Sequence, residues 1–271
     1  MTKAGAMAEL LLKPTGDHGV VTSVTPDSAG WTYLGFEVLR LHAGETEFAE
    51  TGDREACLVL ISGKARVEAG DRDFGEIGER MSPFEGKPHA VYVPSGTRYL
   101  IKATTELTVA IATAPGTRGA RPPRYIDPDG LEVETRGKGS NSRQVVDILP
   151  EWNPADSLLI VEVITPAGNT SSYPPHKHDD DCPPHEGQLE ALFYHRLNPA
   201  QGWVFQRVYT ADRSLDVSLS AEDGDTVLVP RGYHPIATLY GYDSYYLGVM
   251  AGPRRTWKFT TAPEHDWLYK L

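Results

Sequence analysis

Short apolar or alternating runs, separated by glycine, proline and aspartate, recur along the chain and restrict its fold more than any other feature. The chain contains 26 glycines and 21 prolines among its 271 residues. Runs of this kind are CLVLISGKARVEAG (57–70), HAVYVPSG (89–96), LTVAIATA (107–114), SLLIVEVITPAG (157–168), WVFQRVYTAD (203–212) and DTVLVPRG (225–232). Alternation bounded by turn residues is typical of β-strands, and helical periodicity is scarce. The sequence therefore predicts an all-β protein.

The two halves of the chain repeat each other. The matching pairs are LHAGET (41–46) with TPAGNT (165–170), REACLVLISG (54–63) with LEALFYHRLN (189–198), and VYVPSGTR (91–98) with VLVPRGYH (227–234). A repeat of this length indicates a duplicated domain rather than a solenoid unit. Residues 115–143 are rich in proline, glycine and arginine and predict a linker. We therefore expect one domain at 1–114 and a second at 144–271.

The charge balance excludes two classes of partner. The net charge is −11 and the isoelectric point is near 5.3. Such a chain has no basic stripe to replace phosphate counterions, and an acidic surface repels anionic lipid headgroups. We expect neither a nucleic-acid partner nor a membrane partner, whereas a homo-oligomer is compatible with the sequence.

Cysteine usage and the N-terminal segment predict a cytoplasmic protein. The segment MTKAGAMAELLLKP has only the short apolar run Leu10 to Leu12, too short for a signal-peptide core, and no segment approaches membrane-spanning length. The two cysteines, Cys57 and Cys182, lie far apart in the sequence. We expect both to be free thiols.

Histidines cluster in the second half, within SSYPPHKHDDDCPPHEGQLEALFYHRL (171–197). His176 and His178 are two residues apart, so on a strand both side chains point the same way. The two prolines before them disfavour a helix. His234 follows a strand that ends in Pro-x-Gly. Three imidazoles with a carboxylate and open positions suit one divalent ion, Zn²⁺, Mn²⁺ or Fe²⁺.

The carboxylate of this predicted metal site is Glu190, which begins the run EALFYHRL. The repeat places Glu55 at the same point of the first half, and Glu186 is the rival ligand. His185, Cys182 and residues 179–181 are interpreted as loop residues. Counterparts of His176, His178 and His234 in the first half are Gly52, Arg54 and Arg98, so that half is expected to lack metal ligands.

The His-x-His and Gly-x5-Pro-x-Gly…His segments resemble the motifs of the cupin superfamily. The longer interval between His178 and Glu190, with the motifs FYHRLNPAQGW, QRVYTADRSLD and DGDTVLVPRGYHP, resembles the 5-deoxy-glucuronate isomerase family of inositol breakdown. The resemblance implies a bicupin fold of two tandem double-stranded β-helix (jelly-roll) barrels. It also implies conversion of 5-deoxy-D-glucuronate to 5-dehydro-2-deoxy-D-gluconate. Ala191 departs from the family pattern, where a second acidic residue often follows the first.

An aldose–ketose isomerase needs a base, a group for the substrate carboxylate and a cation that polarises the carbonyl. Arg207 is a candidate for the carboxylate, and Tyr245 and Tyr246 are candidates for proton transfer, one of which should face inward. Lys177 lies between two inward-pointing ligands and is rejected as the base. No Gly-x-Gly-x-x-Gly follows a strand, so no nicotinamide is expected. The alternatives are an Fe²⁺-dependent, oxygen-using cupin and a non-catalytic sugar-binding bicupin.

Overall fold

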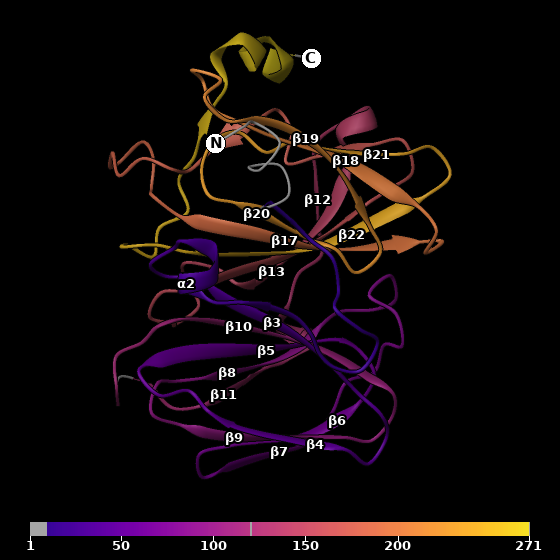
Figure 1. Ribbon diagram of the computed structural model, residues 1–271, viewed down its shortest axis with the longest axis vertical. Coiled ribbons are helices and arrows are strands. Elements are labelled where there is room, and N and C mark those ends of the chain that lie inside the picture. Colours follow the sequence, from indigo (N-terminus) through magenta and orange to yellow (C-terminus); the bar gives the residue numbers. More distant parts are fainter. Residues whose placement is uncertain (1–9, 120, 271) are drawn as a thin grey trace. The chain divides into compact units, whose positions relative to one another are not determined.

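The computed structural model describes residues 10–119 and 121–270 and confirms the all-β prediction (Figure 1). The chain divides into two compact units. The N-terminal unit comprises Pro14–Glu132 and Asp147–Ile160. The C-terminal unit comprises the described residues up to Lys13, Val133–Val146, and the described residues from Val161 onward. Each unit is built from antiparallel sheets, as expected for jelly-roll barrels.

The N-terminal unit contains a six-stranded and a four-stranded sheet. The first has the order β11 (Arg124–Ile126), β8 (His89–Val93), β5 (Arg54–Ser62), β10 (Leu107–Pro115), β3 (Gly35–Leu41) and β2 (Gly19–Val24). The second has the order β4 (Thr46–Glu50), β9 (Arg98–Ala103), β6 (Ala65–Ala69) and β7 (Arg72–Ile77). A short helix α2 (Pro26–Ala29) and a 3-10 turn η1 (Pro128–Gly130) complete the unit.

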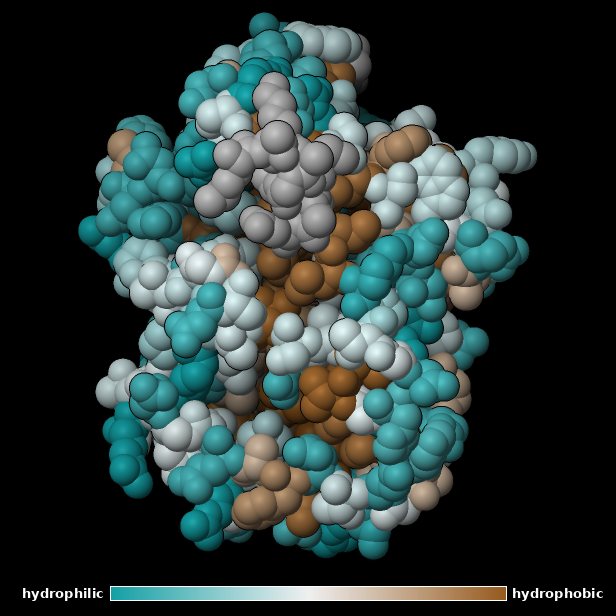
Figure 2. Space-filling view, in the orientation of Figure 1, coloured by the Kyte–Doolittle hydropathy of each residue, from teal (hydrophilic) through white to brown (hydrophobic). Residues whose placement is uncertain are grey.

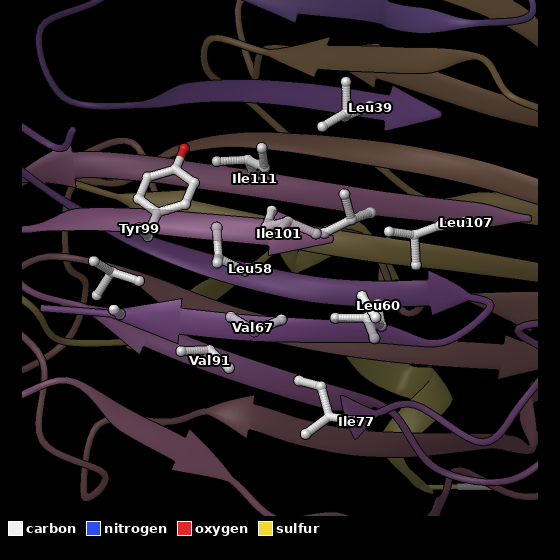
Figure 3. Close-up of a cluster of buried hydrophobic side chains, with 14 of the residues drawn as sticks. Leu39, Leu58, Leu60, Val67, Ile77, Val91, Tyr99, Ile101, Leu107 and Ile111 are labelled. Atoms are coloured by element: carbon white, nitrogen blue, oxygen red, sulfur yellow. The ribbon is translucent and has the colours of Figure 1, made fainter. Parts of the chain in front are cut away.

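The two sheets of the N-terminal unit pack face to face on a continuous apolar core (Figure 3). Strand β5 supplies Ala56, Leu58 and Leu60 to this core, and β9 supplies Ile101 from the opposite sheet. The alternate residues of β5 are also buried, which explains why this strand reads as an unbroken apolar run rather than an alternating one. The space between the sheets is therefore filled by aliphatic side chains.

The C-terminal unit is built around a seven-stranded sheet. Its order is β1 (Leu11–Leu12), β20 (Thr226–Val229), β17 (Glu190–Asn198), β22 (Asp243–Ala251), β14 (Leu159–Thr165), β13 (Arg143–Leu149) and β12 (Glu134–Arg136). A four-stranded sheet has the order β15 (Thr170–Ser171), β21 (Ile236–Thr238), β18 (Trp203–Tyr209) and β19 (Asp216–Glu222). The pair β16 (His176–Lys177) and β23 (Thr260–Thr261), with the turns η2 (Gly139–Asn141) and η3 (Pro263–Lys270), completes the unit.

The boundaries of the units differ from the expected domains at 1–114 and 144–271. Part of the expected linker, residues 115–143, forms strands: β11 pairs with β8, and β12 pairs with β13. Residues 147–160 join the N-terminal unit, and β1 pairs with β20 in the C-terminal unit. Strands of two or three residues are too short to show an alternating pattern. Their pairing depends on a sheet edge that another part of the chain supplies, so the local sequence does not reveal them.

The drawn face of the molecule is dominated by hydrophilic side chains, with hydrophobic side chains gathered in patches (Figure 2). Within the described residues, no helix has the length and apolar character required to cross a bilayer. Residues 1–9, which include most of the segment weighed as a signal peptide, lie outside the described part of the chain.

Candidate metal centre

Three of the predicted ligands lie together in the C-terminal unit. His176 opens β16, His178 follows that strand, and His234 lies just before β21. One ring nitrogen of each lies within 4.8 Å of the others. The ring centre of His234 is 4.9 Å from those of both His176 and His178. The structure therefore brings the His-x-His pair and the distant third histidine to one point.

The hydrogen bonds of His178 and His234 leave one ring nitrogen of each with a lone pair that can bind a cation. Nδ1 of His178 lies 3.3 Å from the Leu189 carbonyl, and Nδ1 of His234 lies 3.0 Å from the Gly232 carbonyl. A carbonyl only accepts, so both Nδ1 atoms carry the proton and both Nε2 atoms are free to bind a cation. Metal-binding histidines are commonly fixed in this way by backbone carbonyls.

The charge state of the three rings suits metal binding as well. Burial lowers the pKa of His176 to about 3, with a further contribution from neighbouring His178. Burial also lowers the pKa of His178, and it lowers that of His234 well below its ordinary value. Neutral imidazoles are the form that binds a metal. The donor set thus fits a divalent ion such as Zn²⁺, Mn²⁺ or Fe²⁺.

A tight turn and a small ionic network hold the three histidines in place. Gly232 has φ +90, and a Cβ there would lie 2.3 Å from the Tyr209 carbonyl oxygen, so only glycine fits the Pro-x-Gly turn. Its amide donates to Asp179 Oδ2 at 2.6 Å, while Lys177 Nζ donates to Asp179 Oδ1 at 2.6 Å. Asp179, interpreted from the sequence as a loop residue, therefore ties the His-x-His strand to the turn before His234.

Neither predicted carboxylate joins the three histidines. Glu186 Oε1 accepts hydrogen bonds from Lys177 Nζ at 2.8 Å and from two backbone amides at 2.9 Å each. Glu190 lies opposite Ala251 in the β17–β22 pair. The histidine-facing positions of β17 are the odd ones, because Phe193 packs on His234 with ring centres 5.3 Å apart. Glu190 therefore points to the other face of the sheet, away from the three histidines.

The three histidines face a cavity of about 500 Å³, a size typical of small-molecule sites. Much of its wall is apolar, contributed by Val145, Val161, Val163, Phe193, Met250 and Phe259. Its polar groups include the three imidazoles, Arg143 and Tyr246. Among the described residues, no aspartate or glutamate lines it. The cavity is thus a largely apolar chamber that contains the three imidazoles and is bordered by the cationic side chains of Arg136, Lys138 and Arg143.

Arg143 opens β13 and was missed by the sequence reasoning, which placed it at the end of the linker. Its Nη1 donates to the carbonyl and side-chain oxygens of Asn141 at 2.9 and 3.1 Å. Burial lowers the pKa of Arg143, and its charge in turn helps to lower the pKa of His176. Within the described chain, Nε and Nη2 form no hydrogen bond to a protein group. Arg143 also lines the cavity.

Comparison with known proteins identifies the family. The family model described as KduI/IolB matches residues 10–268. The chain belongs to the KduI/IolB family. Among its relatives, a protein of Geobacillus kaustophilus is 53% identical over 93% of this chain and 91% of its own length. One of Halalkalibacterium halodurans is 47% identical over 97% of this chain and 99% of its own. Both relatives bear the name 5-deoxy-glucuronate isomerase.

Solved structures place this KduI/IolB member in the bicupin fold. The crystal structure of an IolB-like protein from Salmonella typhimurium LT2 matches with a TM-score of 0.94 and 50% identity, over 96% of this chain and 99% of that one. Oxalate decarboxylase of Lactobacillus farciminis matches with a TM-score of 0.66 and 14% identity, over 97% and 90% of the two chains. At that identity the second likeness concerns the fold alone.

The three candidate catalytic residues of this KduI/IolB member differ in whether they line the cavity. Arg207 lies outside the cavity and forms a two-bond ion pair with Asp216, both contacts at 2.8 Å. Tyr245 is buried away from the cavity and donates to Glu162 at 3.1 Å. Tyr246 lines the cavity, and its hydroxyl lies 2.9 Å from Ser171 Oγ. Of the two tyrosines, Tyr246 is therefore the one that faces the cavity.

Proposed function

We propose that this chain is a metal-dependent isomerase that converts 5-deoxy-D-glucuronate to 5-dehydro-2-deoxy-D-gluconate in the cytoplasm. The observation that carries the proposal is that three histidine nitrogens, within 4.8 Å of one another, and the Arg143 side chain line the same cavity. A sugar acid has a carbonyl group at one end and a carboxylate at the other, and the cavity offers a partner for each. The names of relatives that share about half of the sequence agree with this substrate.

We assign His176, His178 and His234 as the residues that hold one divalent ion. When bound, such an ion supplies a Lewis acid that polarises the substrate carbonyl and stabilises negative charge on its oxygen. Zn²⁺, Mn²⁺ and Fe²⁺ all match imidazole donors. The apolar wall around Phe193 and Phe259 excludes water, which strengthens electrostatic interactions inside the cavity.

Arg143 binds the carboxylate of the substrate in this proposal, the role first given to Arg207. Asn141 fixes Nη1, so the planar Nε–Nη2 edge is held in one orientation and matches a carboxylate with two parallel hydrogen bonds. With the carboxylate held there, the carbonyl end of a short sugar acid extends toward the histidines.

The reaction moves one proton from the carbon beside the carbonyl to the carbonyl carbon, and one hydroxyl proton to the former carbonyl oxygen. Tyr246 is proposed to donate to the substrate oxygens during this exchange. Burial raises its pKa, so the phenol stays protonated at neutral pH and acts as a donor. The Ser171 hydroxyl fixes its position.

The test is conversion of 5-deoxy-D-glucuronate by purified, metal-loaded protein in an anaerobic cuvette without an organic cofactor. We expect full turnover, and in heavy water we expect deuterium in the terminal hydroxymethyl group of the product. Oxygen consumption stoichiometric with product would instead indicate an oxygen-using enzyme, and binding without conversion would indicate a sugar-binding protein.

A matched pair of arginine variants tests the substrate orientation. Arg143→Lys should raise KM by roughly tenfold to a hundredfold, because a hydrogen bond to a charged group is worth about 1.5–3 kcal/mol. Arg207→Lys changes the same residue type outside the cavity and should leave KM unchanged. The reverse pattern would restore the original assignment of Arg207.

A further inference from the structure

Position 191 lies on β17 beside the first predicted carboxylate, and its orientation follows from the strand pairing. Ala191 lies opposite Met250 in the β17–β22 pair, and Phe193 lies opposite Gly248. Met250, Gly248 and Phe193 all line the cavity. Directly opposed residues of an antiparallel pair share a face. Ala191 therefore points to the same side as the cavity, unlike Glu190.

Ala191 also lies between two contacts to the histidines. Two residues before it, the Leu189 amide donates to the His178 carbonyl at 2.8 Å. Two residues after it, Phe193 packs on the ring of His234. A side chain at 191 that was long enough to carry a donor would therefore extend toward both His178 and His234.

The internal repeat gives the same orientation independently. By sequence, Glu55 and Ala56 correspond to Glu190 and Ala191. Ala56 belongs to the core inside the N-terminal unit. Glu55 instead accepts from the Tyr92 hydroxyl and from the backbone amides of residues 156–158. In both repeats the alanine is thus the inward position, and the glutamate beside it is not.

We propose that Ala191 occupies the fourth-ligand position, so that this chain holds its metal through three neutral histidines alone. A carboxylate at 191 would offer a fourth protein donor; with alanine there, oxygen atoms of the substrate would complete the donor set. The inference rests on the proposed metal site and deepens it. Three neutral donors leave the full charge of the ion in the cavity, which favours an anionic sugar acid as the ligand that completes the site.

The test compares metal binding in Glu190→Gln, Ala191→Glu and the size-matched control Ala191→Gln. Affinity for Mn²⁺ is measured by chelator competition, and the Co²⁺ visible spectrum reports the donor set. We expect Glu190→Gln to bind as the natural chain does. Ala191→Glu should bind more tightly than Ala191→Gln by at least the roughly tenfold that even outer-shell partners contribute. It should also show a shifted Co²⁺ spectrum.

Two results would overturn the inference: loss of metal in Glu190→Gln, or equal affinity and spectra for Ala191→Glu and Ala191→Gln. Ala191→Asp provides a shorter carboxylate if glutamate disturbs folding, and the Glu190→Gln result stands without either. Metal affinity is measured without substrate, so failure of the isomerase assay alone would count against the proposed reaction and not against the ligand count.

Discussion

The two units carry different inward-facing side chains on equivalent strands. On β5 of the N-terminal unit the inward residues are Ala56, Leu58 and Leu60, which join a filled apolar core. Their sequence counterparts on β17 are Ala191, Phe193 and His195, and Phe193 borders the cavity. The same strand pattern thus supports either a packed interior or a site, and a few inward side chains decide which.

The counterparts of the histidines in the N-terminal unit have taken structural or surface roles. Arg54, which corresponds to His178 when residues are counted from the shared AG-x-T segment, donates from Nη2 to the carbonyls of Tyr33 and Thr113 at 2.5 and 2.9 Å. Arg98, which corresponds to His234, is exposed and bonds Glu50 at 3.3 Å. We propose that the N-terminal unit is architectural. Four measurements test this difference between the two units.

The largest effect is expected at the histidines. His178→Ala should lower both metal affinity and isomerase turnover more than about a hundredfold, because it removes one of three proposed donors. Loss of a residue that only supports a ligand lowers metal affinity by about tenfold to a hundredfold, and loss of a ligand itself should lower it further. The matched control is Arg54→Ala at the equivalent position, which should retain full metal content by plasma emission. A metal-free Arg54→Ala that is still folded would contradict the separation of roles.

The next effect concerns stability at the paired glutamates. Glu55 is buried and accepts three backbone amides at 2.6–2.7 Å, so Glu55→Ala should cost about 4 kcal/mol of unfolding free energy by leaving buried donors unpaired. Metal affinity should not change. Glu190→Gln should be within about 0.5 kcal/mol of the natural chain. Denaturant unfolding measures the unfolding free energy of both variants. Equal losses of stability would contradict the different roles given to the two glutamates.

A smaller loss is expected for the filled core. Leu58→Ala should cost about 3 kcal/mol, because the surrounding aliphatic side chains leave a void when it is removed. Phe193→Ala borders an existing cavity, so it should cost less stability and instead raise KM. Thermal unfolding and steady-state kinetics on both variants test whether the first loses stability and the second loses substrate affinity. A raised KM in Leu58→Ala would contradict this prediction.

The smallest effect concerns the two thiols. Burial raises the pKa of Cys57 to about 12, whereas Cys182 is exposed. The thiolate is the reactive form, so a thiol reagent should label one cysteine in the native protein and a second only after unfolding. Cys182→Ser should abolish native labelling and keep turnover. Rapid labelling of both thiols in the native state would show that the N-terminal core opens readily.

The sequence by itself determined the all-β class, the duplication and the grouping of His176, His178 and His234. These features depend on local rules: turn residues end strands, residues two apart on a strand share a face, and Gly232 is required at a turn with positive φ. Each can be read from a few neighbouring residues without knowing which strands pair.

Only the tertiary structure decided which face of β17 meets the histidines, and therefore that Ala191, not Glu190, lies on that face with Phe193. Residues 191–195 of this strand are all buried, so its pattern carries no alternation that distinguishes the two faces. The position of Arg143 at the cavity, the position of Arg207 outside it, and the membership of residues 147–160 in the N-terminal unit depend likewise on long-range pairing. Register across a sheet is set by the partner strand, which the residues of one strand do not specify.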